Sequence, residues 1–359
     1  MLTIHVLNAG KGDSIVLHYE DDESESFGVI DSNSKGGDVP ALRKLDELGA
    51  QRLSFLMLTH PHADHYLGLE QVLSRYAGNI GTIFTFPVER DRGRLEKLAK
   101  RYLHAGATGG PSVKGAAESF VTFIAGAGRG ASEWEAPTGL LGLLSVEGFA
   151  GVTFRQILPP SRVKGRFYQD LDKGTYDPES TYPNELCLAV QVSYAGVRTV
   201  LGADGTHANW LYQQSRLKGG DELGSQVVKL PHHGSAEDCS DAVLDSLFAG
   251  NFGQRIALIS ANGASHPSAE VLQYLRKNRI APFCTNLSRH CAGADVRRLH
   301  PLNDLDPALR RFVGSVLTDE AKAVGAPCQG DVALVISSDG KVQVERQYEN
   351  FCPYRDALI

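Results

Sequence analysis

The sequence predicts an α/β fold in which buried strands place polar side chains at one edge of a sheet. Apolar stretches typical of strands end in aspartate or histidine at three places: Phe27 to Ile30 before Asp31, Leu53 to Leu58 before His60, and Val197 to Leu201 before Asp204. Stretches with the spacing of amphipathic helices stand between such strands, as in α/β folds. With 359 residues, the chain is long enough to bury a large core.

The chain opens with a strand-like pattern. Leu2 to Leu7 alternates apolar and polar residues, which predicts a half-buried strand. A glycine-punctuated turn, Asn8 to Ser14, follows, and strand character resumes from Ile15 to Tyr19. Asp31, at the end of the next strand, has two interpretations. It either accepts an N–H from a metal-bound imidazole and fixes the orientation of that ring, or it caps a simple turn.

The strand Leu53 to Leu58 runs directly into a cluster of three histidines and one aspartate. His60 and His62 are two residues apart, so on an extended segment they point the same way. Asp64 and His65 follow at the start of a predicted helix. Imidazole nitrogen and carboxylate oxygen are the ligands that zinc, manganese and iron take. The cluster can therefore supply two adjacent metals with two ligands each.

Two later strands also end in residues of the metal-ligand type. Val197 to Leu201 leads to Asp204, and Val227 to Leu230 leads to the pair His232 and His233. A further strand leads into the loop that carries His266, just before a predicted helix. His266 either stabilises charge on a substrate or protonates a leaving group, or it is a histidine in a helix-capping loop.

The segment 59–65, with the sequence THPHADH, resembles the HxHxDH signature of the metallo-β-lactamase superfamily. Two further segments resemble the ComEC-like competence branch of that superfamily in its stand-alone soluble form: Gly10 to Leu17 with Val29 to Asp31, and Lys229 to Ser235, which is similar to KxxHHGS. The resemblance covers residues 1–74, residues 152–285 and the last hairpin. It implies an αββα sandwich of two mixed sheets with helices outside and the site at one sheet edge.

The same resemblance implies two divalent metals, Zn²⁺ or Mn²⁺. The first would take His60, His62 and Asp204. The second would take Asp64, His65, Asp204 and His232, with Asp204 bridging the two ions. His233 is then a substrate contact or an orienting residue, and the roles of His232 and His233 could be reversed. In this scheme Asp64, His266 and Asp31 are the residues expected to act in catalysis.

One departure from the superfamily pattern concerns the first metal. Superfamily members usually offer a further histidine between the HxHxDH motif and the bridging aspartate. His104 lies in that interval but follows no predicted strand, and the corresponding place carries Asn184. The first metal would therefore be completed by water or by Asn184, and would bind weakly, exchange or accept Mn²⁺.

We expect one domain over residues 1–359 with two insertions, at about 90–151 and 287–329. The first begins with a charged, helix-prone stretch and continues as a segment rich in Gly, Ala and Ser over 106–151, which we interpret as an insertion or elaborated loop. Within it, 120–124 and 139–146 could be strands or turns of helix. A second charged loop is expected over 162–172. The basic residues of these segments either face an anionic substrate or belong to ordinary solvated surfaces.

Composition limits the classes of partner. The net charge is −6, so only local basic clusters would attract nucleic acid. Six cysteines without CxxC spacing suit reduced thiols in a cytosolic protein. No stretch approaches the length of a membrane span, so we expect a cytoplasmic protein without a membrane partner.

The expected function is metal-dependent hydrolysis through a metal-activated water. The resemblance and the arginine-bearing insertions favour a phosphodiesterase or nuclease acting on DNA or another nucleic acid. Lys11 then offers a cation to a substrate phosphate, or is an exposed turn lysine. Two alternatives remain: a hydrolase of small esters, lactones or phosphocholine-like substrates, and a partner-controlled effector module of a multi-protein system. The sequence does not fix the oligomeric state.

Overall fold

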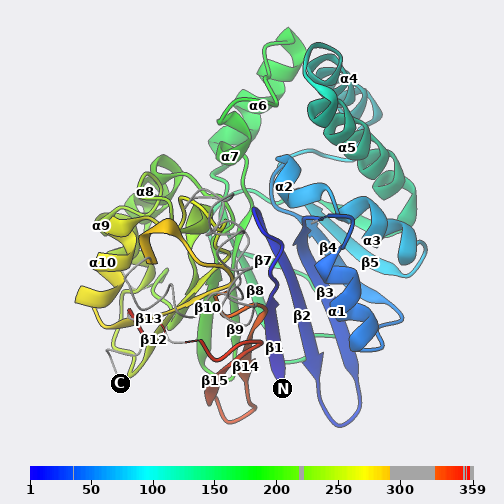
Figure 1. Cartoon of the computed structure of the whole chain (residues 1–359). Helices are drawn as coiled ribbons and strands as arrows, with labels where there is room; N and C mark the ends of the chain where they lie inside the picture. The colour runs from blue at the N-terminus through cyan, green and yellow to red at the C-terminus, as the bar shows by residue number, and fades with distance from the viewer. Residues whose placement is uncertain (35, 218–221, 292–327, 351, 353, 356–359) are drawn as a thin grey trace, which may run out of the picture.

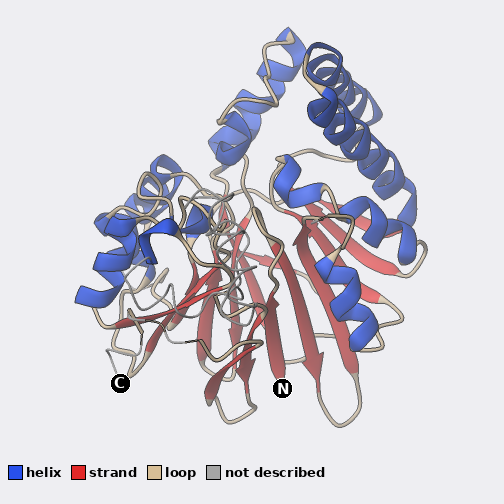
Figure 2. Ribbon diagram, viewed as in Figure 1, coloured by secondary structure: helices blue, strands red, loops and turns tan. Residues whose placement is uncertain are grey.

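Two β-sheets lie face to face, with helices on both outer sides, as Figure 1 and Figure 2 show. This computed structural model describes residues 1–34, 36–217, 222–291, 328–350, 352 and 354–355. Three apolar cores separate the layers: one between the sheets, and one between each sheet and its helices. The fold is therefore an αββα sandwich, as the resemblance implied.

The first sheet has eight strands, in the order β15-β14-β1-β2-β3-β4-β5-β6. Strands β3 to β6 are parallel, and the remaining neighbours are antiparallel. Because parallel neighbours end at the same sheet edge, Asp31 near the end of β3 and the histidines after β4 lie side by side. The strands are β1 (Leu2–Val6), β2 (Ser14–Glu20), β3 (Glu25–Ser32), β4 (Leu53–Leu58), β5 (Ile80–Thr85), β6 (Ala131–Glu135), β14 (Val332–Ile336) and β15 (Val342–Arg346).

The second sheet has seven strands, in the order β13-β12-β11-β10-β9-β8-β7. Its parallel strands β10 to β13 place Asp204, His232 and His266 in the loops after successive strands. These loops meet the histidine cluster of the first sheet. The strands are β7 (Gly142–Leu144), β8 (Thr153–Leu158), β9 (Ala189–Tyr194), β10 (Val197–Leu201), β11 (Val227–Lys229), β12 (Arg255–Ile259) and β13 (Ile280–Cys284).

Side-chain alternation on β4 explains how that strand joins two cores. Phe55 and Met57 pack between the sheets, while Leu56 and Leu58 pack against the outer helices. Every residue of β4 is buried, so the strand is fixed on both faces. Helices α1 (Pro40–Glu47) and α3 (Leu69–Arg75) cover the first sheet, and α8 (His207–Arg216), α9 (Asp241–Leu247) and α10 (Ala269–Lys277) cover the second (Figure 1).

The expected elaborated loop over 106–151 is wrong for most of its length. Helices α4 (Arg92–Thr108) and α5 (Pro111–Gly130) pack side by side. The two strands that follow lie at sheet edges: β6 belongs to the first sheet and β7 to the second. The rings of Tyr102 and Phe120 meet across the helix pair in a tilted arrangement, with centroids 3.9 Å apart. The glycine and alanine content conceals a helical apolar spacing in α5, where Ala117, Phe120, Ile124 and Ala127 are buried.

The charged loop expected over 162–172 is also a helix, α6 (Ser161–Lys173). Its buried residues Val163, Phe167 and Leu171 are four apart, and Gly174 ends the helix in the left-handed conformation, with φ 68°. Helices α4, α5 and α6 stand beyond the sheet edge that carries the histidine cluster (Figure 1). The short helices α2 (Ala63–Tyr66), α7 (Tyr182–Glu185), η1 (Pro231–Gly234) and η2 (Arg289–Cys291) complete the structured elements.

Most of the second expected insertion, over 287–329, lies outside the described residues. Its flanks are described: η2 precedes the undescribed part, and Cys328 and Gln329 follow it. The backbone of both flanking residues bonds to the end of β13, through Cys328 N to Thr285 O (3.1 Å) and Gln329 N to Cys284 O (3.0 Å). In the described part of the chain, no helix is long and apolar enough to cross a membrane.

Candidate metal centre

Asp31 holds the ring of His65. Its carboxylate is fully buried and accepts hydrogen bonds from Thr59 N (2.8 Å), Thr59 Oγ1 (2.6 Å) and His65 Nδ1 (2.7 Å). Burial raises the pKa of Asp31, but these three donors supply the bonds that an ionised carboxylate needs. With Nδ1 engaged, Nε2 of His65 turns toward the centre of the site and has no hydrogen-bond partner.

The tautomer of His60 follows from the same network. Thr59 Oγ1 donates its proton to Asp31, so its oxygen accepts from His60 Nδ1 at 3.1 Å. Burial lowers the pKa of His60 well below its ordinary value, so the ring is neutral. A neutral ring with its proton on Nδ1 has a free lone pair on Nε2.

His62 presents a second lone pair at the same point. Its Nε2 lies 3.1 Å from the carbonyl oxygen of Ser180, which can only accept, so His62 carries its proton on Nε2. The unprotonated Nδ1 then faces His60 Nε2 at 3.2 Å. Two lone pairs at this distance repel each other unless a cation lies between them. The donors of His60 and His62 therefore fit a divalent metal.

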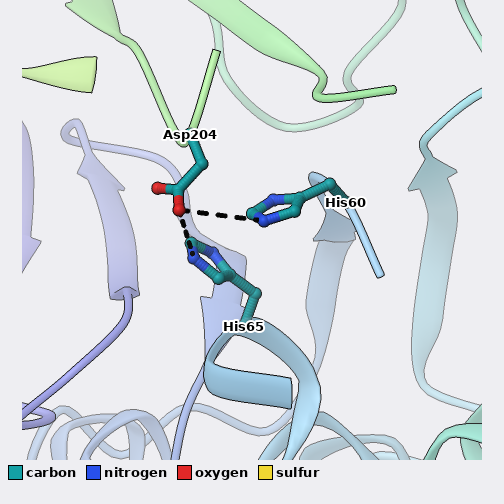
Figure 3. A group of neighbouring side chains, drawn as sticks. All are labelled: His60, His65 and Asp204. Atoms are coloured by element: carbon teal, nitrogen blue, oxygen red, sulfur yellow. Dashed lines mark ion pairs between the residues drawn. The ribbon is translucent and has the colours of Figure 1, made fainter. Parts of the chain in front are cut away.

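Asp204 lies at the centre of the cluster and is 3% exposed. Figure 3 shows its Oδ2 facing two imidazoles, at 3.9 Å from His60 Nε2 and 3.5 Å from His65 Nε2. The same oxygen is 3.7 Å from His232 Nε2, and Oδ1 is 3.6 Å from His233 Nε2. Burial opposes ionisation, but His233 and His65 bring the pKa of Asp204 well below its usual range. One ionised carboxylate thus lies among four imidazoles.

The predicted ligands converge, although they come from three segments that are far apart in the sequence: residues 60–65, the loop after β10 and η1. In two overlapping sets the ligand atoms lie within 4.8 Å of one another: His60, His65 and Asp204 form one, and Asp64, His65 and His233 form the other. The structure therefore brings together all the residues predicted to hold metal, namely His60, His62, Asp64, His65, Asp204 and His232, and places His233 beside them.

The glycine-rich opening turn packs directly on Asp64. A Cβ added to Gly12 would lie 1.9 Å from the carbonyl oxygen of Asp64, and Gly12 has φ +93°. Only glycine fits this position. Lys11, beside it, is 73% exposed at its side chain, with Nζ 3.6 Å from Asp64 Oδ2. The turn thus supports the second half of the ligand cluster and places a cation at the rim of the site.

Three supporting residues were not recognised in the sequence. Asp13 and Lys229 form a fully buried ion pair beneath His233, and Asp238 accepts a hydrogen bond from His232 Nδ1 at 2.5 Å. Asp13 Oδ1 is 3.7 Å from His233 Nδ1. A lysine inside the apolar strand β11 was the available signal, because a buried lysine requires an anionic partner.

A cavity of about 660 Å³ opens in front of the cluster. Its polar lining includes Lys11, Ser180, Asn262, Ser265 and His266. Burial, and then the charges of His233 and His232, lower the pKa of His266 to about 4, so its ring is neutral at pH 7. A neutral imidazole donates a hydrogen bond to a substrate but is a poor source of a proton.

Of the two other candidate ligands, Asn184 lies at the site and His104 does not. Asn184 is 5% exposed and lines the same cavity, and its Oδ1 is buried without a hydrogen-bond partner. His104 is an exposed residue of α4 and lines a different cavity. All six cysteines are buried, and no cysteine belongs to a potential metal cluster among the described residues.

The chain matches no protein-family model and no curated protein. Among solved structures it is similar to a variant of the CmlA β-hydroxylase, with 12% identity and a TM-score of 0.41 over 79% of this chain and 52% of that one. It is also similar to Zn²⁺-bound PqqB from Methylobacterium extorquens (11% identity, TM-score 0.38, 72% and 88% coverage) and to a diphosphatase from the PhnP family (10%, 0.36, 85% and 92%). The chain thus spans about half of the β-hydroxylase. Similarities at this level assign no function, so the function is argued from the site.

Proposed function

We propose that this protein is a metal-dependent hydrolase of the ComEC-like branch of the metallo-β-lactamase superfamily, and that its substrate is a phosphodiester. DNA or another nucleic acid is the leading candidate. The observation that carries the proposal is the position of Asp204. Its two oxygens face different imidazoles, Oδ2 toward His60 and Oδ1 toward His233, so this residue would help to hold both metal ions.

The chain's own residues prepare the site in three ways. Asp31 holds the Nδ1 proton of His65 directly and that of His60 through Thr59, so Nε2 of both rings is left to face the site. When bound, the two ions supply a hydroxide at neutral pH and neutralise charge that develops on the attacked group. Neutral His266 is placed at the cavity wall, where its ring can donate a hydrogen bond to a substrate oxygen.

The cavity supports a phosphodiester over an acyl substrate. Its volume of about 660 Å³ is within the range of small-molecule sites. Cationic Lys11 and the hydrogen-bonding groups of Ser180, Asn262 and Ser265 face it. Phosphate oxygens accept such contacts, whereas the acyl chain of an ester or lactone would bury apolar surface.

The charged helices beyond the site favour a small or single-stranded substrate over a wide duplex contact. Arg94 and Lys164 both pair with Glu89, and Arg166 pairs with Glu185 at 2.5 Å. Paired basic residues attract phosphate weakly, because the acidic partner cancels their field. These helices therefore supply less positive surface than their composition suggested.

The test presents four substrates in parallel to protein loaded with Mn²⁺ or Zn²⁺: single-stranded DNA, bis-p-nitrophenyl phosphate, p-nitrophenyl acetate and a homoserine lactone. We expect cleavage of the two phosphodiesters, loss of cleavage with chelator, and a decrease in kcat of at least about 1,000-fold in Asp204→Asn. His104→Ala, an exposed histidine outside the site, is the matched control and should match wild type.

The alternatives give distinct results in the same assay. Hydrolysis of the acetate or lactone with both phosphodiesters intact would replace the proposal with an ester or lactone hydrolase. Fully metal-loaded protein that cleaves none of the four would instead favour a module that needs a protein partner.

A further inference from the structure

We propose that the consecutive histidines 232 and 233 bind different metals. His232 completes the first site with His60 and His62, and His233 completes the second with Asp64 and His65. The inference rests on the two-metal function proposed above and goes further, because it supplies the third imidazole that the first site otherwise lacks.

The backbone at this pair turns both rings into the site. His232 has φ 43° and ψ 49°, and His233 has φ 56° and ψ 18°. Two consecutive side-chain-bearing residues in the left-handed region are uncommon, because the Cβ crowds the following carbonyl oxygen. Such a conformation persists where surrounding contacts enforce it, and it is frequent at functional sites. Here it aims both Nε2 atoms at one carboxylate, that of Asp204.

The two rings reach opposite oxygens of that carboxylate. His232 Nε2 is 3.7 Å from Oδ2 of Asp204, the oxygen that also faces His60. His233 Nε2 is 3.6 Å from Oδ1. Oδ2 also faces His65, a ligand of the second site, at 3.5 Å. The distances to Oδ2 alone therefore do not show which histidine belongs to which metal site.

Asp64 separates the sites. Its ligand atom lies within 4.8 Å of those of His65 and His233, a set that does not include His232. His233 is therefore the histidine of this pair that belongs to the second metal site, with Asp64 and His65. His232 belongs to neither set, but its Nε2 faces the same oxygen of Asp204 as His60 does, and this places it with the first group.

His232 has an orienting carboxylate, and His233 has a carboxylate nearby. His232 Nδ1 lies 2.5 Å from Asp238 Oδ2, and the other oxygen of Asp238 accepts from His207 N at 2.9 Å. His233 Nδ1 lies 3.7 Å from Asp13 Oδ1, which is too far for a hydrogen bond, so this pairing is electrostatic only. A carboxylate on Nδ1 fixes the tautomer that leaves Nε2 free, which is the usual support for a metal-bound imidazole. A histidine that only lined the cavity would not require it.

The competing ligand for the first site is Asn184. Its unpartnered Oδ1 is buried and it lines the cavity, but an amide oxygen is a weaker ligand for zinc than an imidazole. The experiment therefore includes both residues.

The test is the metal content of the purified full-length protein, measured by elemental analysis after saturation with Zn²⁺ and removal of free ion. We expect two ions per chain in wild type and one in His232→Ala. The double variant His232→Ala with His60→Ala should also keep one ion, because His232 and His60 hold the same ion. His232→Ala combined with His233→Ala should leave none. His104→Ala, the matched exposed histidine, and Asn184→Ala should both keep two.

Two ions in His232→Ala would overturn the assignment, and so would no ion in the double variant that lacks His232 and His60. Either result leaves the proposed hydrolase standing, since wild type still binds two metals. A wild type that binds less than one ion overturns both. If His232→Ala does not fold, Asp238→Asn keeps the imidazole and removes its support. We then expect one of the two ions to be lost to a chelator at least tenfold faster, and equal rates for wild type and variant would overturn the assignment.

Discussion

Lys229 and Asp13 form an ion pair in which both side chains are buried, 0% and 1% exposed. The pair joins β11 of the second sheet to the turn after β1 of the first, across 216 residues of sequence. Removing one partner of such a pair leaves an uncompensated buried charge, at a cost of about 3–5 kcal/mol. We therefore expect Lys229→Met to lower the free energy of unfolding by about that amount in urea titrations.

The matched control is Lys341→Met, which removes a lysine that is 85% exposed and pairs with Asp339 at 2.6 Å. That change should leave the urea midpoint unchanged, because solvent screens a surface pair. Adding Asp13→Asn to Lys229→Met should recover part of the loss, since the carboxylate that lost its lysine is then no longer charged. A loss in Lys229→Met no larger than in the control would contradict the buried-pair argument.

The Lys229–Asp13 pair is an example of a contact that could not be predicted from the sequence. The strands and their polar ends could be predicted because each is a local pattern: an apolar run followed by aspartate or histidine. Contacts between distant segments leave no such pattern. Asp13 was visible only as part of a glycine-rich turn, and Asp238 was not singled out at all. The choice between His232 and His233 depends on left-handed backbone angles, which the sequence does not state.

The two missed helices have a different cause. In α6, charged residues stand between Val163, Phe167 and Leu171 and conceal their spacing of four. In α5, small residues replace the large apolar ones that usually show a helical face. Tertiary packing decided both segments: Phe167 packs against Phe86, with ring centroids 6.1 Å apart, and Phe120 packs against Tyr102. Intrinsic propensity is a weak guide where packing of this kind is available.

Gly12→Ala should damage the second half of the metal centre. The added Cβ would meet the carbonyl oxygen of Asp64 at 1.9 Å, and a left-handed backbone costs alanine about 1–2 kcal/mol more than glycine. The turn or Asp64 must then move, so we expect a lower unfolding midpoint and fewer bound ions per chain. Gly115→Ala, at an open position in α5, is the control. It should lower neither the unfolding midpoint nor the number of bound ions per chain. Full metal content in Gly12→Ala would show that Asp64 tolerates the shift.

Asp31→Asn should weaken metal binding without changing the ligands. Oδ2 of the carboxylate accepts from Thr59 Oγ1 and His65 Nδ1, and Oδ1 accepts from Thr59 N. The amide can accept at only one of these two positions, so its NH2 group faces at least one donor and the side chain must shift. Loss of such an orienting group typically lowers metal affinity by about 10–100-fold. Competition with a fluorescent chelator would measure it. Asp46→Asn, a substitution of a surface aspartate 60% exposed at its side chain, provides the baseline. Equal affinities in the two variants would rule out an orienting role.

Metal binding should release a proton near neutral pH. Burial lowers the pKa of His65, but the carboxylates of Asp204 and Asp31 outweigh it and raise that pKa well above 6.5. In the metal-free protein the ring therefore carries both protons at pH 7. The Nδ1 proton of His65 stays in its hydrogen bond to Asp31. The Nε2 proton must leave before a metal binds. Below the pKa of His65, affinity should fall about tenfold per pH unit for this one linked proton. Calorimetric titrations with Zn²⁺ in buffers of different ionisation enthalpy would count the protons released, and a count of zero between pH 6 and 7 would contradict the raised pKa.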